Sequence, residues 1–216
     1  MKNIAVITGD IINSRDLTDS QKRNVMRILK REFPKICIQL LEHVGSLDFF
    51  RGDSFQGLIK DPRYSLRISI ILRALLRSET QTNILKGKKI WDCRIGIGIG
   101  TWDFITKKVL TSDGAAFVYA GKALDELKSK TNQLQIKGSI MDPQLELFMR
   151  FAETIISKWT IAQSKVACSY LLDTKKTQTV LAEELSISQS ALNRRFKTGY
   201  IEEIRLLCEY FENLIN

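Results

Sequence analysis

The chain has 216 residues and a net charge of +9, with hydrophobic (44%) and charged (26%) fractions typical of a soluble globular protein. Its single histidine, His43, argues against a zinc site and against a Ser-His-Asp or Cys-His nucleophile. Its four cysteines are scattered without a C-x-x-C pair, and its apolar runs are shorter than a membrane span. Because a signal-peptide pattern is also missing, we expect a cytoplasmic protein with reduced cysteines and no membrane partner.

The positive charge is concentrated in the N-terminal part of the chain. Residues 1–142 contain 24 Lys and Arg against 15 Asp and Glu, whereas residues 143–216 contain nine of each. A basic domain favours phosphate-bearing partners, either nucleotides or nucleic acid. A solvated Lys/Arg surface is the simpler alternative.

The first part of the chain alternates strand patterns with helix patterns. Residues 4–8 form a β-branched apolar run typical of a buried strand, and residues 17–33 repeat apolar side chains at helical spacing. Residues 46–59 have two apolar arms around a Gly-Asp pair, which predicts a hairpin. Residues 62–79 begin with a proline and carry an apolar stripe, which predicts a second helix.

A strand is then predicted over residues 89–102, a helix over 112–128 and a short strand over 132–139. The resulting order, β-α-β-β-α-β-α-β, predicts an α+β domain in which helices pack on one mixed sheet. Only helical patterns follow. We therefore divide the chain into an α/β domain, residues 1–140, and an all-α domain, residues 141–216.

Glycine alternates with isoleucine in the segment RIGIGIG. The period of two places Gly96, Gly98 and Gly100 on one face of the sheet. A Rossmann glycine loop follows a strand and opens a helix, whereas these glycines lie inside the strand itself. Glycine weakens a strand unless something approaches its backbone closely. The candidates are a crossing helix, a partner subunit and a ligand, and we rank the first two together ahead of the third.

Two Gly-Asp pairs supply candidate metal ligands. Asp10 ends the first strand, and Asp53 lies at the tip of the predicted hairpin. If these elements pair, the two carboxylates meet at one edge of the sheet, and their repulsion favours a bound Mg²⁺ or Mn²⁺ ion. The backbone N–H groups of Ile12, Asn13 and Ser14 lead toward a helix and are candidate phosphate ligands. On local sequence alone, two aspartates in ordinary turns are the simpler interpretation.

The order of these motifs resembles the class III nucleotidyl cyclases. Asp10-Ile11 matches the Asp-Ile pair after the first cyclase strand, Asp53 matches the Gly-Asp hairpin shared with GGDEF proteins, and RIGIG matches the cyclase R-I-G-I strand. The resemblance implies a ferredoxin-like nucleotide cyclase or polymerase-palm sandwich over about residues 3–138. It also implies metal binding by Asp10, Asp53 and Ile11, and phosphate binding by Lys122.

The chain departs from the cyclase pattern at the substrate-orienting positions. The Asn and Arg that stabilise the cyclase transition state are replaced by Val118 and Lys122. Valine donates no hydrogen bond, and lysine lacks the bidentate fork of arginine. Ser54 stands where GGDEF proteins have a second carboxylate. The two aspartates that would bind metal match the cyclase pattern, whereas the substrate-orienting residues do not. We therefore assign no catalytic residue and leave enzymatic activity open.

Over nearly its whole length the chain resembles the SatD family of bacterial proteins, through ITGDIINSR, RGDSFQ, RIGIGIG and SDGAAF. That resemblance implies a C-terminal helix-turn-helix, which residues 177–207 also predict on their own pattern. The second helix of this unit supplies the candidate DNA-contacting residues: Gln189, Ser190, Asn193, Arg194 and Lys197. Because such a unit also serves as a packing module, both roles stay open.

Two functions follow from these patterns. The first is a Mg²⁺-dependent nucleotide-binding or nucleotidyl-transfer protein coupled to the helix-turn-helix. The second is a non-catalytic, dimeric DNA-binding regulator whose cyclase-like domain senses a nucleotide or only dimerises. We expect a homodimer through the cyclase-like domain, because related folds complete their active sites across two subunits.

Overall fold

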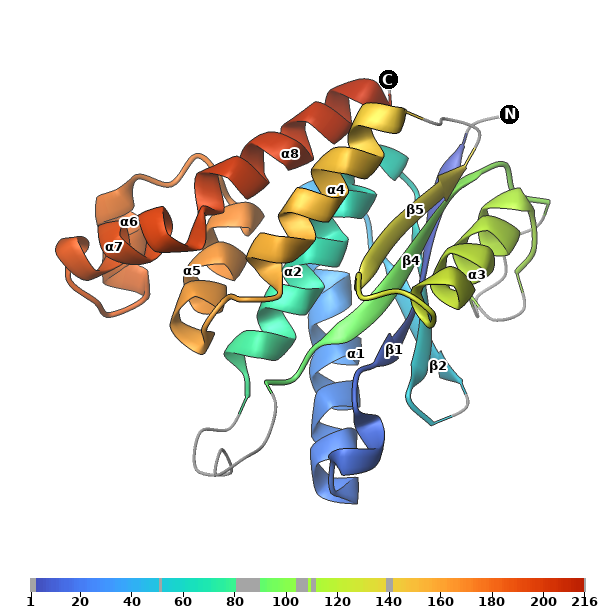
Figure 1. Cartoon of the computed structure of the whole chain (residues 1–216), viewed down its shortest axis with the longest axis horizontal. Helices are drawn as coiled ribbons and strands as arrows, with labels where there is room; N and C mark the ends of the chain where they lie inside the picture. The colour runs from blue at the N-terminus through green and yellow to red at the C-terminus, as the bar shows by residue number, and fades with distance from the viewer. Residues whose placement is uncertain are drawn as a thin grey trace.

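The computed structural model describes residues 3–50, 52–80, 90–103, 109, 112–138 and 142–215. A five-stranded mixed sheet is covered by helices on both faces, and further helices pack beside it (Figure 1). The predicted α+β class and the predicted order of strands and helices are confirmed. None of the described helices is long and apolar enough to cross a membrane.

The sheet has the strand order β2-β3-β1-β4-β5, in which only β4 and β5 run parallel. Its strands are β1 (Ile4–Ile11), β2 (Ser46–Phe50), β3 (Ser54–Ile59), β4 (Cys93–Gly100) and β5 (Leu134–Gly138). The central strand β1 extends beyond the predicted run at 4–8, because its last residues pair with β3 on one side and β4 on the other. This extension carries Asp10 into the sheet.

The helices form two groups along the chain. Those of the sheet domain are α1 (Asp19–Leu41), α2 (Ser65–Ser78) and α3 (Ala115–Leu127), with short 3₁₀ turns η1 (Ser14–Asp16) and η2 (Pro62–Tyr64). Those that follow are α4 (Pro143–Ile156), α5 (Ile161–Leu172), α6 (Gln178–Glu184), α7 (Gln189–Gly199) and α8 (Ile201–Leu214). The predicted domain boundary, between residues 140 and 141, falls on residues that the structure does not describe, so it stays a prediction.

Helix α1 is longer than its sequence pattern indicated. The predicted helical pattern ended at Phe33. The next residue is Pro34, and proline interrupts the hydrogen bonding of a helix interior. The helix nevertheless continues through Pro34 to Leu41. Ile36 and Cys37, beyond the proline, are buried in the core, and this packing compensates for the lost bond.

Alternation along β1 separates the two faces of the sheet. Ala5 and Ile7 belong to the large core that includes residues of α1 and α2. Val6 packs in a smaller cluster with Ala116 and Ala120 of α3. The sheet is therefore sandwiched between α1 and α2 on one side and α3 on the other, as period-two alternation requires.

The glycine face of β4 is filled by helix α3. A Cβ atom built on Gly98 would lie 2.1 Å from the carbonyl oxygen of Ala116 and 2.3 Å from the nitrogen of Ala120. One built on Gly96 would lie 2.5 Å from the nitrogen of Leu124. The helix backbone thus approaches closer than any side chain allows. Of the three alternatives for this face, the crossing helix is confirmed.

A buried ion network joins α2 to the C-terminal helices. Arg73 of α2 donates to the carboxylate of Asp92 at 2.9 and 3.0 Å, and to that of Glu153 in α4 at 2.8 and 3.0 Å. Arg77 also binds Asp92, at 2.8 Å, and the main-chain oxygen of Trp159, at 2.7 Å. The two positive and two negative charges neutralise each other in the buried interior, and one continuous apolar core surrounds them.

Candidate functional site

The two Gly-Asp motifs meet at the C-terminal end of β1. Asp10 is paired in register with Ser54 of β3, and the N–H of Ile11 donates to the main-chain oxygen of Asp53 at 3.2 Å. Burial raises the pKa of the Asp10 carboxyl, Arg94 opposes this rise, and the negative charge of Asp53 adds to it. The structure therefore brings together the two aspartates that the sequence singled out, close enough for the charge of Asp53 to affect Asp10.

A guanidinium group completes this cluster. Arg94, at the start of β4, is the register partner of Asp10 from the other side, and its Nη1 lies 3.2 and 3.3 Å from the two carboxylate oxygens. Arg94 was not among the predicted site residues. Period two places it on the same face as Gly96, but only the pairing of β1 with β4 brings it opposite Asp10. We call Asp10, Asp53 and Arg94 the carboxylate site.

Lys128 also acts electrostatically on this site, although it was not among the predicted site residues. Lys128 follows the last turn of α3, and its charge lowers the pKa of Asp10. It also binds the neighbouring Asp125 at 2.8 Å. Lys122 is exposed and forms no ion pair with the described residues, so its predicted phosphate contact stays a prediction.

The predicted phosphate loop is tied to its neighbours. The N–H of Ile12 donates to the main-chain oxygen of Asp92 at 3.0 Å, so this donor is already bonded. Asn13 has a left-handed backbone, with φ of 53°, and Ser14 donates its hydroxyl to the carboxylate of Asp53. Of the three predicted phosphate-binding N–H groups, that of Ile12 is thus occupied, and those of Asn13 and Ser14 remain predictions.

Asp10 and Asp53 are the side chains of the carboxylate site that could hold a divalent cation. Aspartate oxygens are preferred ligands of Mg²⁺ and Mn²⁺. Within the described ranges, no group of three or more His, Cys, Asp or Glu side chains is arranged to hold a metal ion. An ion bound by Asp10 and Asp53 would therefore take its other ligands from main-chain oxygen, such as that of Ile11, from water or from the phosphates of a ligand.

The sheet beside the carboxylate site carries two further polar side chains. Thr8 and Gln56 lie next to Asp10 and Ser54 on the face of the sheet that α3 covers, and the amide of Gln56 donates to the Thr8 hydroxyl at 3.2 Å. Val118 and Lys122, the residues that replace the cyclase Asn and Arg, lie one turn apart on the exposed side of α3. The site thus contains charged and polar side chains but lacks the Asn and Arg that orient the substrate in the cyclases.

A second candidate site lies on α6 and α7. Ser188 caps α7 by accepting from the N–H of Ala191, and Ser186 in the turn has a left-handed backbone. Leu192 and Phe196 are buried, which fixes the face of α7 that packs inward. The opposite face exposes all five residues predicted to contact DNA: Gln189, Ser190, Asn193, Arg194 and Lys197.

The exposed face of α7 lies away from the sheet. Figure 1 shows α6 and α7 at the far end of the molecule, where α7 contacts α5, α6 and α8. Arg194 and Lys197 form no ion pair with the described residues, and neither does the half-buried Arg195. If the unit were a packing module, these arginines would be expected to bind carboxylates of the N-terminal part, and no such ion pair occurs among the described residues.

Comparison with known proteins identifies the family. The profile of the SatD family matches residues 3–206, which include the carboxylate site and the α6–α7 pair. No curated protein matches the chain. Because the match covers far more than half of the sequence, the chain belongs to the SatD family.

Proposed function

We propose that the carboxylate site binds a nucleotide together with one Mg²⁺ or Mn²⁺ ion. The observation that carries the proposal is the convergence of Asp10 and Asp53, whose mutual repulsion adds to the burial that raises the pKa of Asp10. A cation between the two carboxylates relieves this repulsion. The strand order, with the Gly-Asp hairpin beside β1, supports the further proposal of a ferredoxin-like cyclase or palm fold.

The neighbouring groups have distinct roles in this proposal. Asp10, Asp53 and the main-chain oxygen of Ile11 would hold the metal ion. With a cation on Asp10, the Arg94 guanidinium would be available to bind a phosphate, for which its planar fork is suited. Lys128 adds positive charge at the same end of the sheet. We propose binding rather than cyclase chemistry, because valine and lysine occupy the positions of the cyclase Asn and Arg.

A Mn²⁺ titration tests the metal part directly, since free Mn²⁺ is quantified by its electron paramagnetic resonance signal. We expect Asp10→Asn and Asp53→Asn each to remove most of the binding. Asp61→Asn is a matched control, because Asp61 is also paired with an arginine, Arg63, but lies outside the site. Mn²⁺ binding that Asp53→Asn leaves at the level of the control would refute the site.

The phosphate part has its own measurement. Calorimetry with ATP and GTP in the presence of Mg²⁺ should show that Arg94→Gln weakens nucleotide binding. The same variant should keep or strengthen Mn²⁺ binding, because it removes a positive charge beside Asp10. If Arg94→Gln weakened metal and nucleotide binding equally, Arg94 would be a structural partner of Asp10 and not a phosphate ligand.

We also propose that α6 and α7 form a helix-turn-helix that binds duplex DNA. The supporting observation is the exposure of Gln189, Asn193, Arg194 and Lys197 on one face of α7, away from the sheet. Amide and guanidinium groups bind base edges, while lysine binds phosphates. The acids of α8 are partly neutralised within that helix, since Arg205 binds Glu202 at 2.7 Å.

The salt dependence of DNA binding tests this second function. The double change Arg194→Ala and Lys197→Ala should lower the slope of log affinity against log salt by about one for each phosphate that the variant no longer neutralises. The double change Lys30→Ala and Lys35→Ala on α1 removes the same charge from another exposed helix and should leave the slope unchanged. Absence of binding to genomic fragments and random duplex at low salt would leave α7 as a packing helix.

A further inference from the structure

Ser14 links the two segments of the chain that form the carboxylate site. It begins the 3₁₀ turn η1, and its hydroxyl donates to Oδ2 of Asp53, which lies 39 residues further along the chain. The main chain makes a parallel connection, because the N–H of Ile11 donates to the main-chain oxygen of Asp53 at 3.2 Å. The hairpin that carries Asp53 is therefore fixed by two bonds to the segment that carries Asp10.

The loop that carries Ser14 is itself held in place. The N–H of Ile12 donates to the main-chain oxygen of Asp92 at 3.0 Å, and Asp92 belongs to the buried ion network. The same loop is thus bonded to the core on one side and to the hairpin on the other. The orientation of the Asp53 carboxylate is therefore set before any ligand binds.

The bond from Ser14 determines how Asp53 can bind a cation. Because Oδ2 accepts from the Ser14 hydroxyl, Oδ1 is the oxygen that can ligate a cation while this bond stays intact. Asp53 is then a ligand through one oxygen. Mg²⁺ is typically held in an octahedron by one or two carboxylates together with water and phosphate, whereas Ca²⁺ takes about six to eight oxygens and often both from one carboxylate.

The charge of the site also favours the smaller cation. Arg94 lies 3.2 Å from a carboxylate oxygen of Asp10, and Lys128 adds a second positive charge nearby. The described residues place no third acidic side chain with Asp10 and Asp53. Calcium sites gain affinity from the number of charged ligands. Two carboxylates opposed by two cationic side chains therefore suit an ion that completes its shell with water and phosphate.

We propose that Ser14 makes the carboxylate site selective for Mg²⁺ and Mn²⁺ over Ca²⁺ by holding Asp53 as a ligand through one oxygen. This inference rests on the metal binding proposed above, and it gives the Ser14 side chain a role separate from the phosphate contact predicted for its N–H. Ser14 acts through Asp53, so it is a positioning residue. Loss of its hydroxyl frees Oδ2 and lets Asp53 offer both oxygens, which is the arrangement that Ca²⁺ favours.

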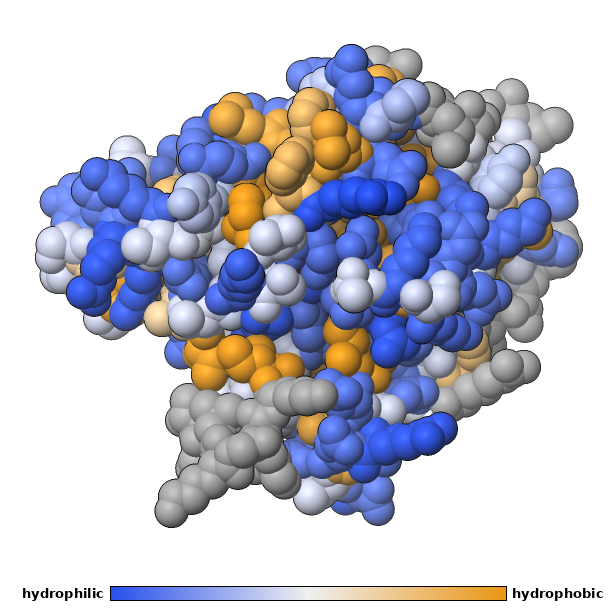
Figure 2. Space-filling view, in the orientation of Figure 1, coloured by the Kyte–Doolittle hydropathy of each residue, from blue (hydrophilic) through white to orange (hydrophobic). Residues whose placement is uncertain are grey.

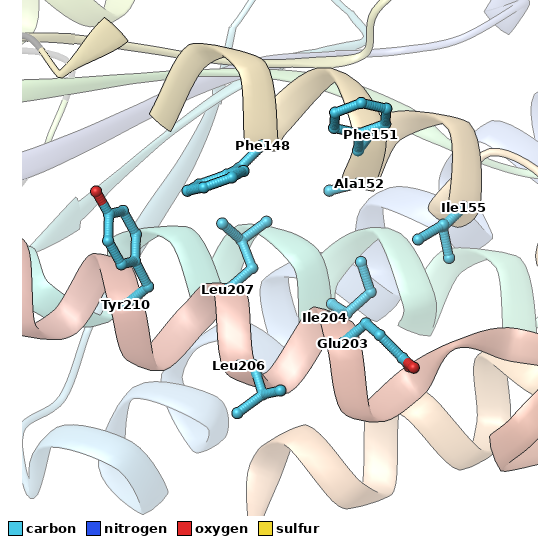
Figure 3. A pocket seen from close by; sticks show the side chains of 9 residues that line it. All are labelled: Phe148, Phe151, Ala152, Ile155, Glu203, Ile204, Leu206, Leu207 and Tyr210. Carbon is cyan, nitrogen blue, oxygen red and sulfur yellow. The ribbon is translucent and has the colours of Figure 1, made fainter. Parts of the chain in front are cut away.

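The apolar groove between α4 and α8 differs from this site in its chemistry. Figure 3 shows Phe148 and Phe151 of α4 on one side of it and Leu207 and Tyr210 of α8 on the other. Glu203 is the one carboxylate among the residues that line it, and hydrophobic atoms gather over the same two helices (Figure 2). Hard divalent cations bind to converging oxygens. We therefore expect one Mn²⁺ ion per chain, at the carboxylate site.

Competition between Mn²⁺ and Ca²⁺ on the full chain tests the proposal. Free Mn²⁺ is followed by its electron paramagnetic resonance signal while Ca²⁺ is added, and the two dissociation constants give the preference for Mn²⁺. Ser14→Ala should lower this preference about tenfold or more, because a group that orients a metal ligand is lost. Ser14→Thr keeps a hydroxyl and should keep the preference. Ser20→Ala is the matched control, since Ser20 is exposed at the start of α1 and outside the site.

The outcomes separate selectivity from metal binding itself. A preference that Ser14→Ala leaves unchanged would overturn the proposal, even if both affinities fell together, because Ser14 would then only support the fold of the site. A wild type that binds Ca²⁺ more tightly than Mn²⁺ would overturn it as well. A wild type that binds no Mn²⁺ would refute the metal site and this inference with it. Circular dichroism should show that all variants are folded.

Discussion

Gly98 provides the sharpest test of how β4 and α3 pack. The structure places the backbone of α3 against this glycine, so that an added Cβ would lie 2.1 Å from the Ala116 oxygen and 2.3 Å from the Ala120 nitrogen. Carbon atoms in contact are normally about 3.5–4.0 Å apart. Gly98→Ala must therefore lift α3 from the strand by more than about 1 Å, because both obstacles are backbone atoms.

The cost follows from this displacement. Adding a methyl group to a well-packed core costs about 1–3 kcal/mol, and no flexible side chain is available here to move aside. We expect the free energy of unfolding to fall by about 3 kcal/mol, at the upper end of that range. For a chain of this length, this corresponds to a Tm lower by roughly 6–12 °C.

Gly121→Ala is the matched control on the same helix. A Cβ on Gly121 would meet no atom within 4 Å, and alanine is favoured over glycine in a helix interior by about 0.5–1 kcal/mol. The two glycine-to-alanine changes should thus shift stability in opposite directions in urea unfolding followed by circular dichroism. A Gly98→Ala protein as stable as the wild type would refute the close approach of α3.

Three further predictions concern buried groups. Asp92→Asn should lower the free energy of unfolding by about 3–5 kcal/mol in urea unfolding, because it leaves Arg73 with less negative charge in the core. Burial acts to raise the pKa of Asp92, but the charge of Arg73 outweighs burial and the pKa is lowered. The stability difference between wild type and variant should therefore be full at neutral pH and shrink as acid protonates Asp92. Trp159→Phe loses the indole bond to the main-chain oxygen of Gly199, at 2.7 Å, and should cost at least about 1 kcal/mol by the same assay. Burial raises the pKa of the Cys37 and Cys208 thiols to about 12, so both should react with a thiol reagent at pH 8 far more slowly in the native than in the urea-unfolded protein.

The order of elements was predictable because each has a local signal. Period-two and helical apolar patterns, a Gly-Asp turn and a proline at a helix start are all read from neighbouring residues. The end of α1 was not predictable in this way. Its continuation past Pro34 depends on the burial of Ile36 and Cys37 in a core that the local pattern does not contain.

The candidate site was predictable in part for the same reason. Asp10 and Asp53 each follow a glycine at the end of an apolar run, and a resemblance of motif order linked them. Arg94 lies within the RIGIG motif, but neither it nor Lys128 was assigned a role, because their proximity to Asp10 depends on strand register and on the path of α3. The glycine face of β4 left three alternatives open, because alternate glycines in a strand indicate a close approach to the backbone but do not identify the group that approaches.

A continuous series of bonds links the carboxylate site with α7. The N–H of Ile12 binds the main chain of Asp92, whose carboxylate binds Arg77; Arg77 binds the main-chain oxygen of Trp159, and the Trp159 indole binds that of Gly199 at the end of α7. The buried charged hydrogen bonds in this series are costly to break, and they add to the apolar packing between α2 and α5. Because each bond in the series is directional, the loop beside Asp10 and the end of α7 are held in one frame, and a movement of either one strains the bonds that lead to the other.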